Sequence, residues 1–145
     1  MNIKNESPVP QGKYIPAVRH ADVVYTSGMT PRKKGTLLFA GKVKAEMPPE
    51  HYKDAIELAT TNALNATINC LKENEKISQI LQLNVFLNTE ENCTTHPKIA
   101  DYASDLIIKL LGKNSIGARA AIGVASLPSN ATVEITLTAK VVAKL

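Results

Sequence analysis

The segment Val133–Val142 alternates apolar and polar side chains as far as Val141, which is the pattern of a β-strand with one buried and one open face. Its apolar side chains share one face: Val133, Ile135, Leu137, Ala139 and Val141. Its polar side chains, together with the preceding threonine, take the other: Thr132, Glu134, Thr136, Thr138 and Lys140. This is the clearest strand signal in the chain, and it indicates a sheet that is covered on one side.

The rest of the chain supplies further strands and two helices. Residues 22–27, which end at Gly28, and 77–87 are rich in β-branched, aromatic or other apolar residues and predict strands; 36–40 and 118–126 are also expected to be strands. Apolar residues at three- and four-residue spacing predict helices from Pro48-Pro49 to about Lys72 and from about 94 to 111, before Gly112. The order ββαβαββ predicts an α+β fold, a mixed sheet with both helices packed on one face.

Length and composition indicate one globular domain. The chain has 145 residues, of which 44% are hydrophobic, and we expect a loose N-terminal tail at residues 1–11 and one domain at 12–145. No apolar run approaches the ~20 residues of a membrane span, and the N-terminus lacks the pattern of a secretory signal, so we expect no membrane association and a cytoplasmic location. Cys70 and Cys93 are interpreted as free thiols.

Charge and histidine spacing give little support for nucleic acid or metal. The formal net charge is +4, but the basic residues are spread along the chain and aromatic residues, which single-stranded nucleic acid would stack on, make up only 4%. We therefore expect a solvated basic surface rather than a nucleic-acid site. His20, His51 and His96 are far apart in sequence and have no ligand-like spacing, so no metal site is predicted.

Arg119 and Glu134 are the candidate reactive pair. Arg119 shares its predicted strand face with small residues, which leaves room for a ligand, and a guanidinium binds a carboxylate with two parallel hydrogen bonds. If 118–126 and 133–142 form a hairpin turning at Leu127-Pro128, Arg119 and Glu134 become diagonal neighbours on one face. The alternative is a plain cross-strand ion pair, which spacing alone does not exclude.

Several motifs resemble those of the RidA/YjgF (reactive intermediate deaminase) family. Its C-terminal run "ARxx…VAxLP…(V/I)EIE" is matched by Ala118-Arg119-Ala120-Ala121, Val124-Ala125-x-Leu127-Pro128 and Val133-Glu134-Ile135. Weaker matches are Gly12-Lys13-Tyr14-x-x-Ala17-Val18, Tyr25-Thr26-Ser27-Gly28 and Val85-Phe86-Leu87. The resemblance runs from about Gly12 to Val142 and is closest to a longer branch of the family.

The resemblance implies a fold, an assembly and a reaction. The fold would be chorismate-mutase-like and assembled as a homotrimer, with sites in the clefts between subunits. The reaction would be hydrolysis of reactive enamines and imines, such as 2-aminoacrylate or 2-iminobutyrate, to 2-keto acids and ammonia, without metal or organic cofactor. By position, Arg119 would bind the substrate carboxylate, Glu134 would place the attacking water, and Tyr14, Gly28 and Ala121 would line the site.

Three positions depart from the family pattern and leave other functions open. Met29 stands where the family has Gln, Ala121 where many members have Cys, and Thr136 where the second Glu of "EIE" is expected. One alternative is therefore a trimer that binds small carboxylate metabolites without turnover. RNA cleavage or translation inhibition, an older description of the family, is supported here only by the basic charge.

Overall fold

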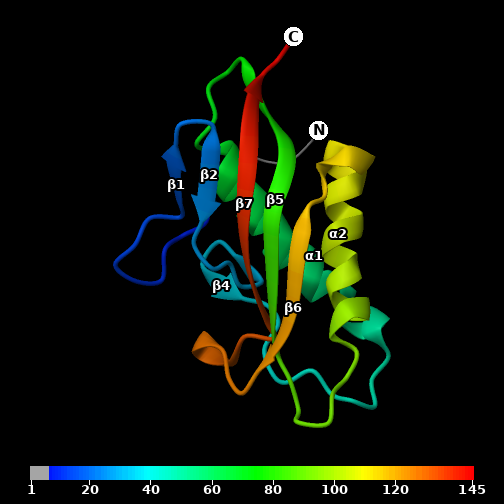
Figure 1. Ribbon diagram of the computed structural model, residues 1–145. Coiled ribbons are helices and arrows are strands. Elements are labelled where there is room, and N and C mark those ends of the chain that lie inside the picture. The colour runs from blue at the N-terminus through cyan, green and yellow to red at the C-terminus, as the bar shows by residue number, and fades with distance from the viewer. Residues whose placement is uncertain (1–6) are drawn as a thin grey trace.

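A five-stranded mixed sheet forms one layer of the computed structural model, which describes residues 7–145; residues 1–6 of the predicted tail lie outside the described residues. The strand order across the sheet is β1 (Ala17–His20), β2 (Val23–Thr26), β7 (Val133–Ala143), β5 (Glu75–Asn88) and β6 (Ala118–Val124). Strands β5 and β6 run parallel, and every other neighbouring pair is antiparallel. The long strands β7 and β5 form the centre of the sheet (Figure 1).

Two helices form the second layer. Helix α1 (Lys53–Ile68) follows a 3₁₀ turn, η1 (Pro49–Tyr52), and α2 (His96–Leu111) stands beside the β6 edge of the sheet (Figure 1). Their buried aliphatic side chains meet the apolar face of β7, which includes Ile135 and Leu137, in one core. The predicted α+β fold with two helices packed on a mixed sheet is confirmed, although α1 ends at Ile68 rather than near Lys72.

The N-terminal strands differ from the prediction. Strand β1 was not predicted; it is four residues long and is followed by Ala21, whose φ is 53°. The expected strand at 36–40 is reduced to β4 (Thr36–Leu37), which pairs with β3 (Arg32–Lys33) in a separate two-stranded sheet. The tight turn at Lys34 and Gly35, both with positive φ, folds this segment back on itself, so it does not join the main sheet.

The predicted hairpin between 118–126 and 133–142 is wrong, because β5 lies between β6 and β7. The connection is a 3₁₀ turn, η3 (Pro128–Asn130), that includes two residues with positive φ and passes the end of β5. There the side chain of Asn88, at the end of β5, donates hydrogen bonds to Asn130 Oδ1 and to the carbonyl of Ala131. These bonds fix the connection at the end of β5, and β7 then pairs with the edge of β5 that β6 does not use.

An ion pair joins the first strand to the start of β5. Arg19 Nη1 and Nη2 bind Glu75 Oε2 and Oε1 at 2.6 and 2.9 Å. These hydrogen bonds, with the backbone N–H of Lys72, lower the pKa of Glu75 to about 2. A carboxylate whose folded-state pKa is lowered stabilises the fold above its ordinary pKa of 4.5, and this stabilisation is lost as the pH falls toward 2.

We therefore expect Glu75→Gln to make the free energy of unfolding depend less on pH between about 2 and 4.5. The variant should be less stable than the wild type at neutral pH, and the difference should shrink as the pH falls from 4.5 toward 2, because protonation removes the same charge from the wild type. Urea unfolding at a series of pH values measures this. Parallel pH profiles for the two proteins would contradict the assignment.

Both cysteines carry free thiols, as predicted. Within residues 7–145, no helix is long and apolar enough to cross a membrane.

Candidate functional site

Arg119 and Glu134 lie on opposite faces of the sheet. Arg119 on β6 is paired with Leu83 on β5, which is paired with Leu137 on β7, and this row faces the helices. Glu134 is paired with Phe86, three positions further along β5 than Leu83, and side chains three apart on a strand point to opposite faces. The expected diagonal contact within one chain is therefore wrong: the two side chains cannot act on one ligand from the same subunit.

Helix α2 holds the Arg119 side chain at the edge of the sheet. Nη1 of Arg119 donates to Asp101 Oδ1 at 2.7 Å and to Ser104 Oγ at 3.1 Å, and Nη2 donates to the carbonyl of Pro97 at 3.4 Å. Ala121, two positions along β6, shares this face and packs against the core. Arg119 thus has a defined orientation in the subunit.

The space beside Arg119 within one subunit is too small for a metabolite. A depression of about 10 Å³ lies between α2 and β6, and its lining includes Ser104, Gly117 and Arg119. A cavity of that size holds about one water molecule. A ligand that binds this guanidinium therefore needs additional walls.

Glu134 lies half-buried on the open face of the sheet, packed across Gly28. A Cβ atom on Gly28 would lie 2.6 Å from Glu134 Cδ and 2.9 Å from its Oε1, so the missing side chain makes room for the carboxyl group. Burial raises the pKa of Glu134. Within residues 7–145 no group donates a hydrogen bond to this carboxyl group, so it is free to bind water or a ligand.

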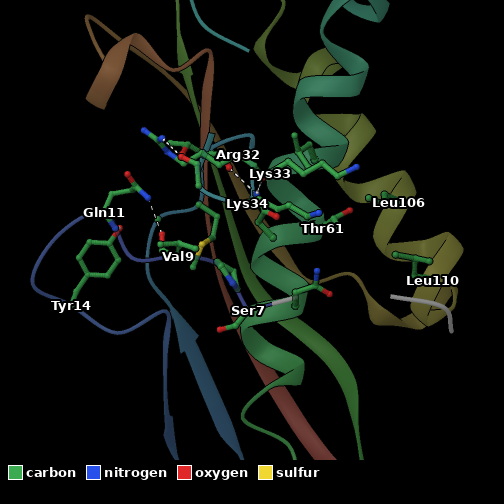
Figure 2. A pocket seen from close by; sticks show the side chains of 18 residues that line it. Ser7, Val9, Gln11, Tyr14, Arg32, Lys33, Lys34, Thr61, Leu106 and Leu110 are labelled. Carbon is green, nitrogen blue, oxygen red and sulfur yellow. Dashed lines mark hydrogen bonds between the residues drawn. The ribbon is translucent and has the colours of Figure 1, made fainter. Parts of the chain in front are cut away.

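Tyr14 and Gly28 line a large cavity. The cavity measures about 820 Å³ and lies between the N-terminal segment and α1 (Figure 2). Tyr14 stands on the N-terminal side, where its hydroxyl accepts a hydrogen bond from the backbone N–H of Gln11. Arg119, Ala121 and Glu134 are not among the lining residues, so a single chain brings together two of the five predicted site residues in this cavity.

The open face of the sheet carries apolar side chains around a polar centre. Val18, Tyr25 and Ile122 are each about half exposed, and their register places them on the same face as Glu134. At the centre, Gln82 donates to Asn84, which donates to Thr136, at 3.0 and 3.1 Å. No helix covers this face in the part of the chain that Figure 1 draws as ribbon.

Sequence reasoning missed the residues that hold Arg119. Pro97, Asp101 and Ser104 are separated by four and three positions, so they share one face of α2. This spacing is visible in the sequence, but it becomes informative only when β6 is placed at the edge of the sheet beside α2. Among residues 7–145, no group of three or more histidine, cysteine, aspartate or glutamate side chains could hold a metal ion.

Comparison with known proteins identifies the family. Residues 5–141 match the family described as "YjgF/chorismate_mutase-like, putative endoribonuclease". The chain belongs to this family. The match spans nearly the whole chain, including every predicted site residue, and it confirms the resemblance to RidA/YjgF proteins.

Relatives in the YjgF family carry different descriptions. A "2-iminobutanoate/2-iminopropanoate deaminase" from Dermatophagoides farinae is 30% identical over 89% of this chain and 86% of that protein. A "putative endoribonuclease" from Shewanella oneidensis superposes with a TM-score of 0.83 at 30% identity, covering 93% of this chain and 89% of the other. A protein of unknown function from Agrobacterium tumefaciens gives a TM-score of 0.80 at 30% identity, with coverage of 94% and 86%.

The close approach of Gly28 to Glu134 leads to a prediction. Gly28→Ala should displace the Glu134 carboxyl group, because a Cβ atom 2.6 Å from Cδ is far inside contact distance. The flexible end of Glu134 can move, so we expect only a small loss of stability. For the imine hydrolysis proposed below, we expect kcat to fall by about 10-fold or more. A double-mutant cycle with Glu134→Gln, read by kcat, measures the coupling. Fully additive effects would show that Gly28 does not act through Glu134.

Proposed function

We propose that this protein is a cytoplasmic hydrolytic deaminase of small carboxylate-bearing imines and enamines, of the 2-aminoacrylate or 2-iminobutyrate type, that works as a homotrimer without a cofactor. The observation that carries the proposal is the division of the predicted site between the two faces of the sheet. Arg119 is held at the edge of the sheet with too little space beside it, and Glu134 lies on the open face without a hydrogen-bond partner among residues 7–145. A complete site would therefore combine Arg119 of one subunit with Glu134 of a second copy.

The open face supports such an assembly. Half-exposed apolar side chains at Val18, Tyr25 and Ile122 lie on the same face as Glu134, and an apolar face of this kind is typical of a surface that another subunit covers. We place the β6 edge of one subunit, with Arg119 and Ala121, against the Glu134 and Gly28 region of its neighbour. Cyclic repetition of this contact would give three equivalent sites.

The reaction then follows from the two groups. The Arg119 guanidinium binds the substrate carboxylate, while Glu134 orients a water molecule at the imine carbon. An enamine first takes a proton on carbon to become the imine. The water oxygen forms a bond to the imine carbon as the C=N π electrons move to the protonated nitrogen, and the surplus water proton passes to the carboxylate of Glu134.

Collapse of the resulting carbinolamine completes the hydrolysis. The proton on Glu134 is transferred to the amino nitrogen, the C–N bond breaks as the oxygen forms the carbonyl, and the hydroxyl proton passes to the departing ammonia, which leaves as ammonium. A carboxyl group whose pKa is raised by burial suits this exchange, because its protonated form is accessible nearer to neutral pH. The sum is protonated imine plus water giving 2-keto acid plus ammonium.

The test is direct turnover. 2-Aminoacrylate or 2-iminobutyrate is generated in situ, and its disappearance is followed with and without the protein. We expect the protein to accelerate formation of the 2-keto acid. A decay rate unchanged by the protein, together with binding of 2-oxobutanoate, would favour the non-catalytic binding module for these substrates instead.

A further inference from the structure

We propose that Asp101 is a positioning residue for substrate binding: it anchors one nitrogen of Arg119 so that the opposite edge of the guanidinium faces the substrate carboxylate. The proposal rests on the proposed function, in which Arg119 binds that carboxylate. It adds Asp101, a residue outside the predicted site, and it assigns anchoring to Nη1 and substrate binding to the Nε–Nη2 edge of Arg119.

The anchoring groups come from one face of one helix. Pro97, Asp101 and Ser104 follow each other at helical spacing on α2 and all meet the guanidinium from the same side. Strand β6 lies next to this helix face and carries Arg119 as its second residue (Figure 1). The guanidinium is therefore held from behind by the subunit's own helix.

The donors of the guanidinium divide into two sets. The side chain has five N–H donors. Nη1 donates to Asp101 and Ser104, and Nη2 has a longer bond, at 3.4 Å, to the Pro97 carbonyl. Nε–H has no partner within residues 7–145, and Nε is not among the buried polar atoms that lack one there. Nη2, with a single long bond, can still donate to a ligand. Nε–H and Nη2–H lie parallel on one edge, which is the fork that binds a carboxylate.

A second arginine in the same protein, Arg19, forms a bidentate ion pair in which two nitrogens bind two carboxylate oxygens. Arg19 binds Glu75 with two nitrogens, at 2.6 and 2.9 Å to the two carboxylate oxygens. Asp101 instead uses one oxygen on one nitrogen of Arg119, and 60% of its side chain is exposed. A purely structural pair gains most from the fork geometry. Asp101 therefore does not form a fork with Arg119, and Nε on the other edge of the guanidinium has no partner within residues 7–145.

The opposite interpretation makes a different prediction. If Asp101 were a competitor that fills the place of the substrate carboxylate, its removal would tighten substrate binding. If it is an anchor, its removal frees the guanidinium to rotate away from the productive orientation and weakens binding. The sign of the change in KM therefore distinguishes the two roles.

The experiment compares three full-length variants with the wild type on 2-iminobutyrate generated in situ. We expect Asp101→Ala to raise KM about 10-fold, the cost of disordering one charge-assisted contact, while kcat changes much less. Asp101→Asn keeps an oxygen that accepts from Nη1 and should restore KM to within about 3-fold of the wild type. Asp105→Ala on the same helix, whose side chain makes none of these contacts, serves as a matched control and should leave KM unchanged.

Binding of 2-oxobutanoate, measured by calorimetry, gives a readout independent of turnover. Dissociation constants should follow the same order, and Asp101→Ala should have no further effect in an Arg119→Ala background. A KM for Asp101→Ala that is unchanged or lower than that of the wild type overturns the inference. An unchanged or lower KM for Asp101→Ala leaves the proposed function standing as long as the wild type is active and Arg119→Ala is inactive. If the wild type neither turns over the imine nor binds 2-oxobutanoate, both fall together.

Discussion

Arg119→Ala should lower kcat/KM for 2-iminobutyrate by about 100-fold or more. The two hydrogen bonds of the guanidinium fork to a carboxylate are charge-assisted, and a pair contributing about 1.5 kcal/mol each corresponds to this factor. Arg119→Lys should still lose about 10-fold, because an ammonium group cannot form the parallel pair. Both variants should fold, since the side chain lies at the edge of the sheet and its ion-pair partner Asp101 is largely exposed.

The matched control for Arg119 is Arg19→Ala. Arg19 also binds a carboxylate from the edge of the sheet, but it lies on β1, at the opposite edge from β6. Its removal should lower the melting temperature and leave kcat/KM unchanged. Full activity of Arg119→Ala, or an equal loss of activity in Arg19→Ala, would refute the assignment of Arg119 as the carboxylate-binding residue.

Glu134→Gln should separate activity from stability. A side chain that places water and exchanges a proton contributes about 100-fold or more to the rate, so we expect kcat to fall by that factor, with KM little changed because the substrate carboxylate is bound elsewhere. Stability should change in the other direction. Burial raises the pKa of Glu134, so its ionised form destabilises the folded state, and a neutral amide of the same shape relieves this.

The stability difference between Glu134→Gln and the wild type should depend on pH with a definite sign. A carboxyl group with a raised folded-state pKa binds its proton more tightly in the folded protein, so wild-type stability falls as the pH rises through that pKa. At pH 7 the variant should therefore melt at a higher temperature than the wild type, and the difference should vanish at low pH, where the wild-type carboxyl group is protonated. Calorimetric melting at both pH values tests this. A variant that is less stable at pH 7 would show that the Glu134 carboxylate has stabilising partners.

Local patterns in the sequence predict the elements that depend on local periodicity. The alternation in 133–142 and the three- and four-residue spacing in both helices report which faces are buried, and burial of those faces is what the fold achieves. Strand β1 gives too weak a signal, because four residues with two polar side chains are a short pattern. The strand predicted at 36–40 is too long, because the turn at Lys34 and Gly35 closes a hairpin in which each strand pairs over two residues.

The order of strands does not follow from the same patterns. Alternation shows that a strand has two faces but does not name its neighbour, and the assumption that consecutive strands pair produces the wrong β6–β7 hairpin. The sequence does contain a contrary signal: strand, helix and strand from Glu75 to Val124 is the order of a βαβ unit, in which the strands are parallel and can be adjacent. Such a unit pairs the strand of Arg119 with β5, and Glu134 is then no longer its cross-strand neighbour.

The most direct test of the shared site is complementation between two inactive variants. Arg119→Ala and Glu134→Gln carrying different affinity tags are co-expressed, mixed assemblies are purified through both tags, and their turnover of 2-iminobutyrate is compared with each variant alone. If each site takes Arg119 from one subunit and Glu134 from the next, every mixed trimer contains one intact site and should show about one third of wild-type activity. Mixed assemblies of verified composition that remain as inactive as their parents would contradict a site built between subunits.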